Sequence, residues 1–305
     1  MAIESTVITG DHATGYSADA PCLAASTRGT AGRWNADGNP ATADASDAAY
    51  PATAAYDGNY STITRMAAGA TRWYVLTLPS STVDCISVHV HDAGLAGGAT
   101  YAEMTAYLSD SEATPTDLEI TGITSARARF DGNPQRLFVP RLQISGDTGD
   151  TARRFTGAVY LKLKFVADAG TCRPQLSECH AGRARQMQRR YLYPDNERAL
   201  VGNNRLHTAT SGLVTRYQVH GGLIRLDERF ALTSSTEADE MASWFEDTSH
   251  GLHKTIWCPR PKSAPDTYAL INMDTDALNL PRQHVGQWDF RLQGLEDGGF
   301  PRSSE

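Results

Sequence analysis

Short apolar runs separated by turn-forming residues constrain this chain most. Residues 73–78 end at Pro79, and residues 85–91 alternate apolar and polar side chains with period two. Gly, Asp, Asn and Pro fill the gaps between runs, as they do in turns. Further runs lie at residues 103–108, 136–139 and 159–166. Strands at this spacing, with almost no helical periodicity, predict a mainly β fold built as an antiparallel sandwich or barrel.

The first 55 residues differ from this pattern. They hold few large apolar side chains and are rich in Ala, Thr, Asp and Gly. A segment of this composition has little with which to build its own core. We therefore expect loops and short strands that lie on the rest of the protein, beginning with a strand at residues 5–9.

The last third of the chain predicts strands around one helix. Residues 212–220 and 223–232 are predicted strands, and Gly221-Gly222 between them favours a two-residue hairpin turn. Ser234 to Glu237 form a capping-box sequence before an apolar stripe at helical spacing, and Gly251 would end that helix. Strands at residues 254–258, 268–273 and 285–292 complete the predicted elements.

A basic stretch marks the expected boundary between two domains. Residues 181–195 hold four arginines between Arg183 and Arg190. One interpretation is a solvated linker or first strand, because charge runs usually face water. The other is a basic arm that lies on an acidic neighbouring subunit. We place the domains at residues 1–182 and 183–305.

Composition excludes several classes of function. The chain has 305 residues and a net charge of −7, which argues against generic binding to nucleic acid or to an anionic membrane. No apolar stretch approaches the roughly 20 residues that span a bilayer, so no membrane insertion is expected. The first ten residues lack the basic start and apolar region of a secretory signal, and assembly in the cytoplasm is the expectation.

Catalytic and metal motifs are absent or ambiguous. The sequence has no nucleophile elbow, phosphate loop or HExxH motif, and its five cysteines include no CxxC pair. His89 and His91 lie two apart on a predicted strand and, with Asp92, have the residue types to hold a metal. The alternative is that both histidines lie on the solvated face of an edge strand.

The sharpest local signal in the first half is the turn around Asp57-Gly58-Asn59. Asp57, Asn59 and Thr62 offer carboxylate, amide and hydroxyl oxygens, which are ligands that Ca²⁺ prefers. The alternative is a tight turn before a strand, with no metal. No other cofactor is expected.

Residues 54–64, followed by the strands at 72–78 and 85–90, resemble a discoidin-like, or galactose-binding-like, sandwich. Residues 159–165 and 174–182 resemble its closing strand and the segment after it, so the resemblance covers about residues 50–182. The chain departs from the family at Ile63-Thr64-Arg65, where the family often has a tryptophan after the Thr. The resemblance implies a host-surface glycan as a ligand. The residues expected to contact it are Tyr56, Asp57, Asn59, Tyr60 and Arg65.

Residues 190–300 resemble the ring domain of distal or minor tail proteins of long-tailed bacteriophages. The residues that carry this resemblance are 211–217, 225–232, the helix at 237–245, and the strands at 253–259 and 286–292. It implies a tail-tube-like sandwich or split barrel flanked by one helix. The domain would form a closed ring, with a hexamer favoured over a trimer, next to tail tube and tail hub proteins. The residues considered for the ring interface are Arg216, Tyr217, Trp257 and Trp288, and burial in the core is the alternative for the two tryptophans.

The sequence therefore predicts a structural virion protein of a phage tail tip. Its ring domain would sit at the distal end of the tail tube, and its sandwich would bind glycan or brace neighbouring tail proteins. One alternative is a carbohydrate-binding adhesin without a ring role. Another is a glycan-cleaving enzyme, which needs two carboxylates facing a cleft, and the sequence identifies no such pair. We therefore expect no enzymatic activity.

Overall fold

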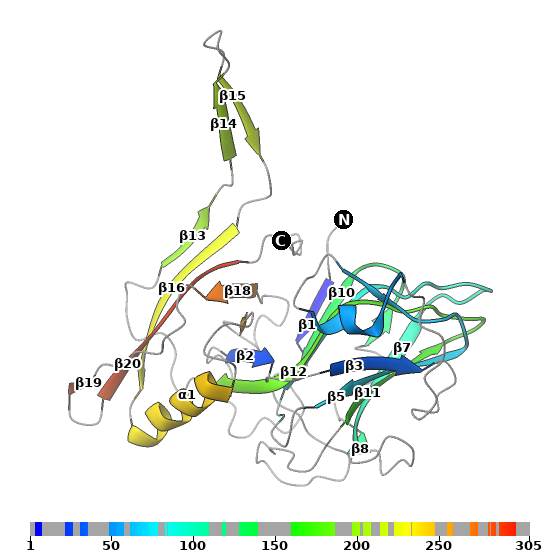
Figure 1. The fold of residues 1–305 in the computed structure, drawn as a ribbon, viewed down its shortest axis with the longest axis horizontal. Coiled ribbons are helices and arrows are strands. Elements are labelled where there is room, and N and C mark those ends of the chain that lie inside the picture. The colour runs from blue at the N-terminus through cyan, green and yellow to red at the C-terminus, as the bar shows by residue number, and fades with distance from the viewer. Residues whose placement is uncertain are drawn as a thin grey trace.

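The structure is a computed structural model, and its fold is mainly β with one α-helix (Figure 1). It describes residues 4–7, 22–26, 31–35, 49–57, 62–78, 83, 85–109, 118–119, 128–139, 160–186, 197–201, 204–208, 214–218, 223–232, 234–247, 255–258, 269–273, 280, 282–284 and 287–296. The mainly β fold class predicted from the sequence is confirmed. No helix among these residues is long and apolar enough to cross a membrane.

The elements follow one another along the chain in two groups. The first group is β1 (Glu4–Val7), β2 (Cys22–Ser26), β3 (Ala31–Asn35), the 3-10 helix η1 (Ala52–Tyr56), β4 (Thr64–Arg65), β5 (Thr71–Thr77), β6 (Cys85–Asp92), β7 (Ala102–Ser109), β8 (Leu118–Glu119), β9 (Arg129–Phe130), β10 (Gln135–Val139), β11 (Tyr160–Ala167) and β12 (Gln175–Gln186). The second group is β13 (Glu197–Val201), β14 (Asn204–Thr208), β15 (Val214–Gln218), β16 (Leu223–Leu232), α1 (Ser235–Asp247), β17 (Thr255–Cys258), β18 (Ala269–Met273), β19 (Arg282–His284) and β20 (Gln287–Glu296).

The first group forms a two-layered sandwich. One layer is a six-stranded sheet in the order β3-β5-β11-β7-β8, with β9 paired to β7. The other layer is the β1-β10-β6-β12 end of a long sheet, in which only the β1–β10 pair is parallel. Alternate side chains of the two layers meet in one core, where Tyr74, Phe130 and Phe165 of the six-stranded sheet join Ile86 and Leu137 of the long sheet. Period-two alternation therefore places these residues as the sequence predicts.

The long sheet continues without interruption into the second group. Its order is β1-β10-β6-β12-β2-β17-β18-β20-β16-β13, so β2 lies between β12 and β17. β2 comes from the N-terminal segment that we expected only to lie on the rest of the protein, and it pairs on both edges instead. β12 extends to Gln186, past the predicted boundary at residue 182. The division into two domains stays a prediction.

A second, separate core lies under the helix α1. Phe230 of β16 and Phe290 of β20 are directly opposite each other, and their rings stack with centroids 6.0 Å apart. Met241, Trp244 and Phe245 of α1 pack into the same cluster. The helix begins as predicted, because the Ser234 hydroxyl oxygen accepts a hydrogen bond from the Glu237 N–H at 3.1 Å. The residues around Gly251 lie outside the described ranges.

The hairpin predicted at Gly221-Gly222 is wrong. β15 pairs with β14, and β16 pairs with β13 and β20, so β15 and β16 follow one another along the same side of a longer ribbon. A glycine pair between two strand-like runs signals a change of direction locally, but it does not select the partner of either run. Here the partners are strands upstream of both, at residues 197–201 and 204–208.

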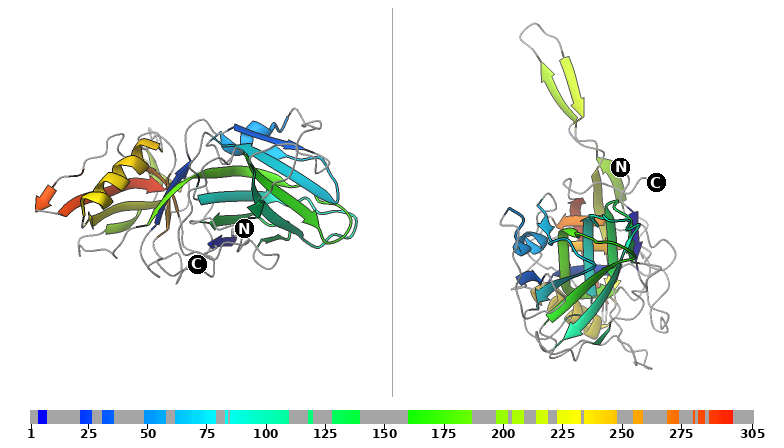
Figure 2. Two further views of the ribbon diagram at one scale, coloured as in Figure 1. Left: turned by 90° about the horizontal axis from the view of Figure 1, so that it is seen from below. Right: turned by 90° about the vertical axis from the view of Figure 1, so that its right-hand side faces the viewer.

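That ribbon projects from the protein. Figure 1 shows β14 and β15 reaching beyond the ends of β13 and β16, and the second view of Figure 2 shows the same pair standing clear of both sheets. β14 and β15 form a two-stranded sheet of their own in the part of the chain that the structure describes. We call the strands β14 and β15 the ribbon.

Candidate functional site

The 3-10 helix η1 is joined to the sandwich by hydrogen bonds from two buried side chains. The Thr64 hydroxyl donates to the carbonyl of Pro51 at 2.7 Å, and the Tyr74 hydroxyl donates to the carbonyl of Ala52 at 3.2 Å. Both side chains are fully buried. Burial raises the pKa of Tyr74, and the nearby Cys179 and Glu178 raise it further, so its hydroxyl keeps its proton and acts as a donor. These two bonds tie the backbone at the N-terminal end of η1 to the sandwich.

Polar and aromatic side chains lie at the two ends of η1. At its C-terminal end Asp57 is exposed, and its carboxylate accepts a hydrogen bond from the Thr62 hydroxyl at 2.8 Å. At its N-terminal end the Arg65 guanidinium lies over the ring of Tyr50, 3.8 Å from the centroid. Tyr56 packs partly against the sandwich core. We call Tyr50, Tyr56, Asp57, Thr62 and Arg65 the η1 site.

The η1 site combines three kinds of group that bind neutral polar ligands. Asp57 can accept hydrogen bonds, Arg65 can donate several, and the tyrosines offer aromatic surface with a polar tip. The structure places Tyr56 and Asp57 at the C-terminal end of η1 and Arg65 beside its N-terminal end, and their contact with a glycan stays a prediction. Asn59 and Tyr60 lie outside the described residues. The sequence analysis does not include Tyr50 among the site residues. Its position directly before Pro51 favours an extended or turn conformation, which is the one signal that the sequence offers.

The described part of this loop does not fit a calcium ion. Of the three oxygen ligands considered, Asp57 and Thr62 lie together and bond to each other, and Asn59 is not described. No group of three His, Cys, Asp or Glu side chains within the described ranges is arranged to hold a metal. Calcium binds six to eight oxygens, so one carboxylate and one hydroxyl are not a sufficient ligand set.

The interpretation of His89 and His91 as a pair on a solvated edge strand is wrong for His89. β6 lies between β10 and β12, and His89 is 2 % exposed, whereas His91 is exposed. His89 lies 2.9 Å from the Ser87 hydroxyl and meets the His180 ring edge-on. Burial lowers the pKa of His89, and His180 and Arg136 lower it further, so the ring is neutral at physiological pH. His89 is buried because β6 lies between two other strands of the sheet. This strand order cannot be predicted from the spacing of the two histidines.

An aromatic pair lies on the outer face of the six-stranded sheet. The rings of Trp73 on β5 and Tyr107 on β7 have centroids 5.7 Å apart, and the Lys164 ammonium on β11 lies 5.5 Å from the Trp73 centroid. All three side chains are half-buried. This outer face is a second surface with an aromatic platform, and sequence reasoning did not single it out.

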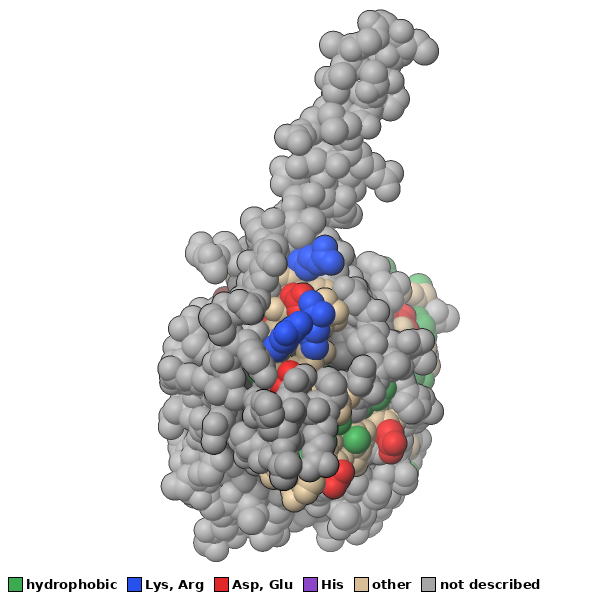
Figure 3. Space-filling view, turned by 90° about the vertical axis from the view of Figure 1, so that its left-hand side faces the viewer, with side chains coloured by type: hydrophobic (Ala, Val, Ile, Leu, Met, Phe, Trp, Pro, Cys, Tyr) green, Lys and Arg blue, Asp and Glu red, His purple; other side chains and the backbone are tan. Residues whose placement is uncertain are grey.

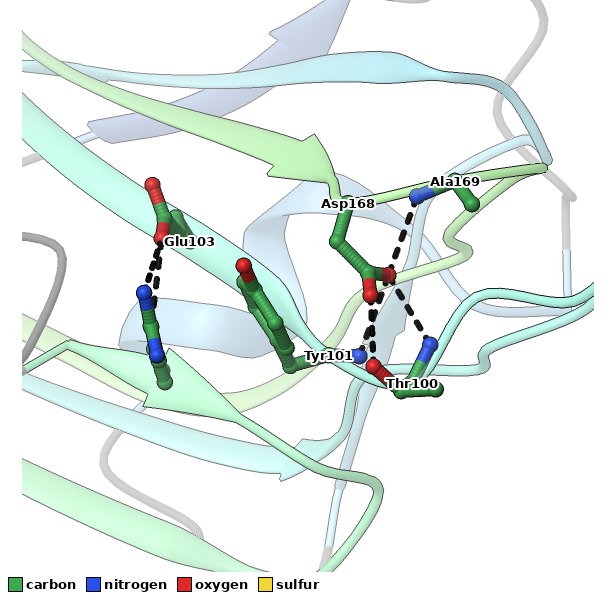
Figure 4. A network of polar contacts seen from close by, with 6 residues as sticks. Thr100, Tyr101, Glu103, Asp168 and Ala169 are labelled. Carbon is green, nitrogen blue, oxygen red and sulfur yellow. Dashed lines mark hydrogen bonds and ion pairs between the residues drawn. The ribbon is translucent and has the colours of Figure 1, made fainter.

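A third polar cluster ties two loops of the sandwich together. The Asp168 carboxylate accepts hydrogen bonds from the Thr100 hydroxyl and from the backbone N–H groups of Thr100, Tyr101 and Ala169 (Figure 4). These bonds lower the pKa of Asp168 to about 2, chiefly through the Thr100 hydroxyl. These bonds join the loop at residues 100–101 to the loop at residues 168–169.

The basic stretch at residues 181–195 does not form an arm where the structure describes it. Arg183 is buried, and its Nη1 donates to the Ser243 hydroxyl at 3.1 Å. Arg185 forms an ion pair with Glu240. The carbonyl of Arg183 accepts a hydrogen bond of 2.9 Å from the Trp244 indole. These two arginines therefore bind the helix of their own chain, because β12 runs beneath α1.

The ring-interface candidates lie on three different elements. Arg216 and Tyr217 are on β15, directly opposite Leu206 and Arg205 of β14, and Trp257 is on β17, opposite Leu23 and Ala269. Trp288 on β20 packs partly against the C-terminal core, whereas Trp244 and Phe245 are fully part of it. The structure does not bring the four candidates to one element, and the interface assignment stays a prediction.

Comparison with known proteins gives similarity to carbohydrate-binding modules. No family model matches the chain, and no curated protein matches it. A selenomethionine-labelled mutant of chitosan-binding module 1 from a chitosanase/glucanase of Paenibacillus sp. IK-5 is similar with a TM-score of 0.34 and 16% identity, over 52% of this chain and 98% of that chain. Another structure of the same module gives a TM-score of 0.32 and 23% identity, over 47% and 97%. CBM32-1 from a family 31 glycoside hydrolase of Clostridium perfringens gives 0.30 and 12%, over 52% and 96%. At these values the likeness does not extend to a ligand.

Proposed function

We propose that this chain is a non-catalytic binding protein of a bacteriophage tail tip, whose sandwich contacts a glycan on the host surface. The proposal includes no bond-breaking step. The sandwich supplies the binding surface, and the C-terminal part joins the protein to further copies and to tail tube and tail hub proteins.

The observation that supports glycan binding is the η1 site. Its backbone is held by the buried hydroxyls of Thr64 and Tyr74, while Asp57 remains exposed at the surface. A site that is ordered before the ligand arrives loses less conformational entropy on binding, which favours affinity. Acceptors, donors and aromatic surface at the two ends of one short helix suit a ligand with many hydroxyl groups.

Self-assembly is the second component of the proposal. It is supported by the ribbon, because an isolated two-stranded hairpin is at best marginally stable in water. β14 and β15 each have one edge that pairs with no third strand among the described residues. Free strand edges are covered in natural proteins, and a neighbouring subunit is one way to cover them. A closed ring of hexameric or trimeric order is the assembly we propose, with the virion tail tip as its place.

The test of glycan binding is a glycan array probed with the full-length chain, followed by titration of any glycan that binds. We expect Asp57→Asn and Arg65→Met each to weaken binding by at least tenfold, which is about 1.4 kcal/mol. The matched control is Trp73→Leu, which removes an aromatic ring from the other surface and should leave binding unchanged. Binding that depends on Trp73 and not on Asp57 would move the site to the outer sheet face. A chain that binds no glycan would favour the bracing role.

A further inference from the structure

Two cysteines that are far apart in the sequence meet in the long sheet. Cys22 is the first residue of β2, and Cys258 is the last residue of β17. The two strands pair antiparallel, and their register sets Cys22 directly opposite Cys258. β2 lies between β12 of the sandwich and β17 of the C-terminal part (Figure 1). The pair is therefore located where the long sheet passes from one part of the chain to the other.

The register meets the backbone requirement for a disulfide between these residues. Directly opposite residues of an antiparallel pair have Cα atoms about 4.5 or about 5.5 Å apart, depending on whether they exchange hydrogen bonds. A disulfide needs Cα atoms about 4.4–6.8 Å apart, so both kinds of pair lie within that range. Directly opposite residues also lie on the same face of a sheet. Because this pair is the last in the register of β2 and β17, a small backbone adjustment there disturbs no pair beyond it.

The other three cysteines have no cysteine opposite them. The register sets Cys85 and Cys179 opposite a glycine and a valine, and Cys172 forms an isolated bridge with a glycine. All three are buried thiols that form no disulfide. Burial raises the pKa of Cys172 and of Cys179, which keeps these thiols protonated, and only a thiolate attacks a disulfide. The pair suited to oxidation is therefore the one between β2 and β17.

We propose that Cys22 and Cys258 form an intrachain disulfide when the protein meets a small-molecule disulfide such as oxidised glutathione. The thiolate of one cysteine attacks the small molecule, forms a mixed disulfide and releases one small thiol. The other cysteine then attacks the protein-bound sulfur, which forms the protein disulfide and releases the second small thiol. Two protein thiols are oxidised, one small-molecule disulfide is reduced to two thiols, and the protons of the protein thiols pass to these products.

The bond is a redox-dependent staple between β2 and β17. It closes a loop that spans most of the chain, and stabilisation by a disulfide increases with the length of the loop that it closes. It also prevents β17 from separating from β2, so the long sheet stays continuous at this point. A reducing cytoplasm keeps such a pair as thiols, and an oxidising medium closes it.

The covalent test is tryptic peptide mapping of the full-length wild type. Dilute folded protein is incubated with oxidised or with reduced glutathione, and its remaining thiols are then alkylated in denaturant. We expect oxidation to remove two of the five thiols and to link residues 1–28 to residues 255–262. The proposal would be overturned by free thiols at both positions, by a lasting glutathione adduct, by a bond to any other cysteine, or by a covalent dimer.

Thermal unfolding tests the role of the bond as a staple. The oxidised wild type should have a Tm at least about 5 °C above that of the reduced wild type. Cys22→Ser and Cys258→Ser should each abolish this difference. The matched control is Cys172→Ser, which removes a buried thiol elsewhere and should keep the difference. A linked wild type with the Tm of the reduced chain would overturn the stapling role.

Salt distinguishes the bond from noncovalent ties between strands. Figure 3 shows basic side chains close to acidic ones on one face of the molecule, and Arg291 with Asp227 is one exposed ion pair of the C-terminal strands. Such pairs weaken in high salt, because dissolved ions screen exposed charges. The Tm difference between oxidised and reduced wild type should therefore be the same at low and at high salt. A difference that disappears in high salt would mean that oxidation acts through charged groups, and it would overturn the staple.

Discussion

The sandwich and the C-terminal part bury their apolar side chains in different ways. In the sandwich, two sheets face each other, and inward side chains such as Phe165 and Ile86 meet side chains of the opposite layer. In the C-terminal part, one helix covers one section of the long sheet, and the core consists of the residues beneath that helix. The ribbon extends beyond this cover (Figure 1). The two parts therefore differ in what covers their apolar side chains: a second sheet in the sandwich, and one helix in the C-terminal part.

Trp244→Ala is the substitution with the largest expected effect on this contrast. Trp244 is 1 % exposed, and its indole donates to the carbonyl of Arg183, so it joins α1 to β12. Removing a fully buried tryptophan leaves a cavity and costs about 3–5 kcal/mol. We expect the C-terminal core to lose this stability while the sandwich keeps its own. Native-state hydrogen exchange followed residue by residue measures both at once.

Phe165→Ala is the matched substitution on the sandwich side, because Phe165 is fully buried in the other core. It should lower protection in the sandwich and leave α1 unchanged. Trp244→Phe keeps most of the volume and loses the indole hydrogen bond, at a cost of about 1 kcal/mol. Equal loss of protection in both cores after either alanine substitution would mean that the continuous sheet makes them one cooperative unit.

The same contrast explains how far the sequence predicts the structure. Local patterns predicted β5, β6, β7, β10 and β11 of the sandwich and α1 with its Ser234 cap, because alternation and capping depend on neighbouring residues. They did not predict the short strands β4, β8 and β9. They did not place β2 in the middle of the long sheet, because a short run of small residues receives its position from β12 and β17. They also could not assign β15 to β14, since strand pairing is a long-range choice.

In the candidate site, too, local features could be predicted from the sequence and long-range contacts could not. The turn at Asp57 was identifiable because Asp-Gly-Asn has a local conformational preference. The contact of Arg65 with Tyr50 and the aromatic pair of Trp73 and Tyr107 depend on register between strands or on loop closure, and no spacing in the sequence signals them. The burial of His89 likewise follows from strand order.

A smaller effect on stability is expected from substituting Asp168, which is hydrogen-bonded to two loops of the sandwich. Its folded pKa of about 2 lies below the ordinary 3.8, so its contribution to stability is complete above pH 4 to 5. That contribution is lost as the pH falls from about 4 through 2, because the carboxyl is then protonated. Asp168→Asn should lower the Tm at pH 7, and the difference from the wild type should shrink between pH 4 and pH 2. Thermal unfolding measured from pH 7 to pH 2 follows this difference directly.

Thr100→Val is the graded control for that experiment. It removes the hydroxyl donor that contributes most to the lowered pKa of Asp168 and leaves the backbone donors of Thr100, Tyr101 and Ala169 in place. Its effect should have the same pH dependence and a smaller size than that of Asp168→Asn. A difference between wild type and Asp168→Asn that stays constant down to pH 2 would show that Asp168 contributes by packing and not by its charge.

The smallest expected effect on stability concerns two ion pairs of similar exposure, one in each part of the molecule. In the sandwich, Arg129 and Glu103 have side-chain exposures of 48% and 32%, and in the C-terminal part Arg291 and Asp227 have 47% and 30%. Their geometry differs. Arg129 directs Nε and Nη2 to one oxygen of Glu103, at 3.2 and 3.1 Å. Arg291 directs Nε and Nη2 to separate oxygens of Asp227, at 2.7 and 2.6 Å.

Bidentate pairing is stronger than pairing through one oxygen, so Asp227→Asn should cost more stability than Glu103→Gln. Both costs should lie within the 0.2–1 kcal/mol that is typical of exposed pairs, and both should fall in high salt. Hydrogen bonds from Arg291 lower the pKa of Asp227, so its cost should also fall as the pH drops below 4. Urea unfolding at two salt concentrations measures the costs. If the two substitutions cost the same, pairing through two oxygens would contribute no more stability than pairing through one, and the difference in geometry would not matter.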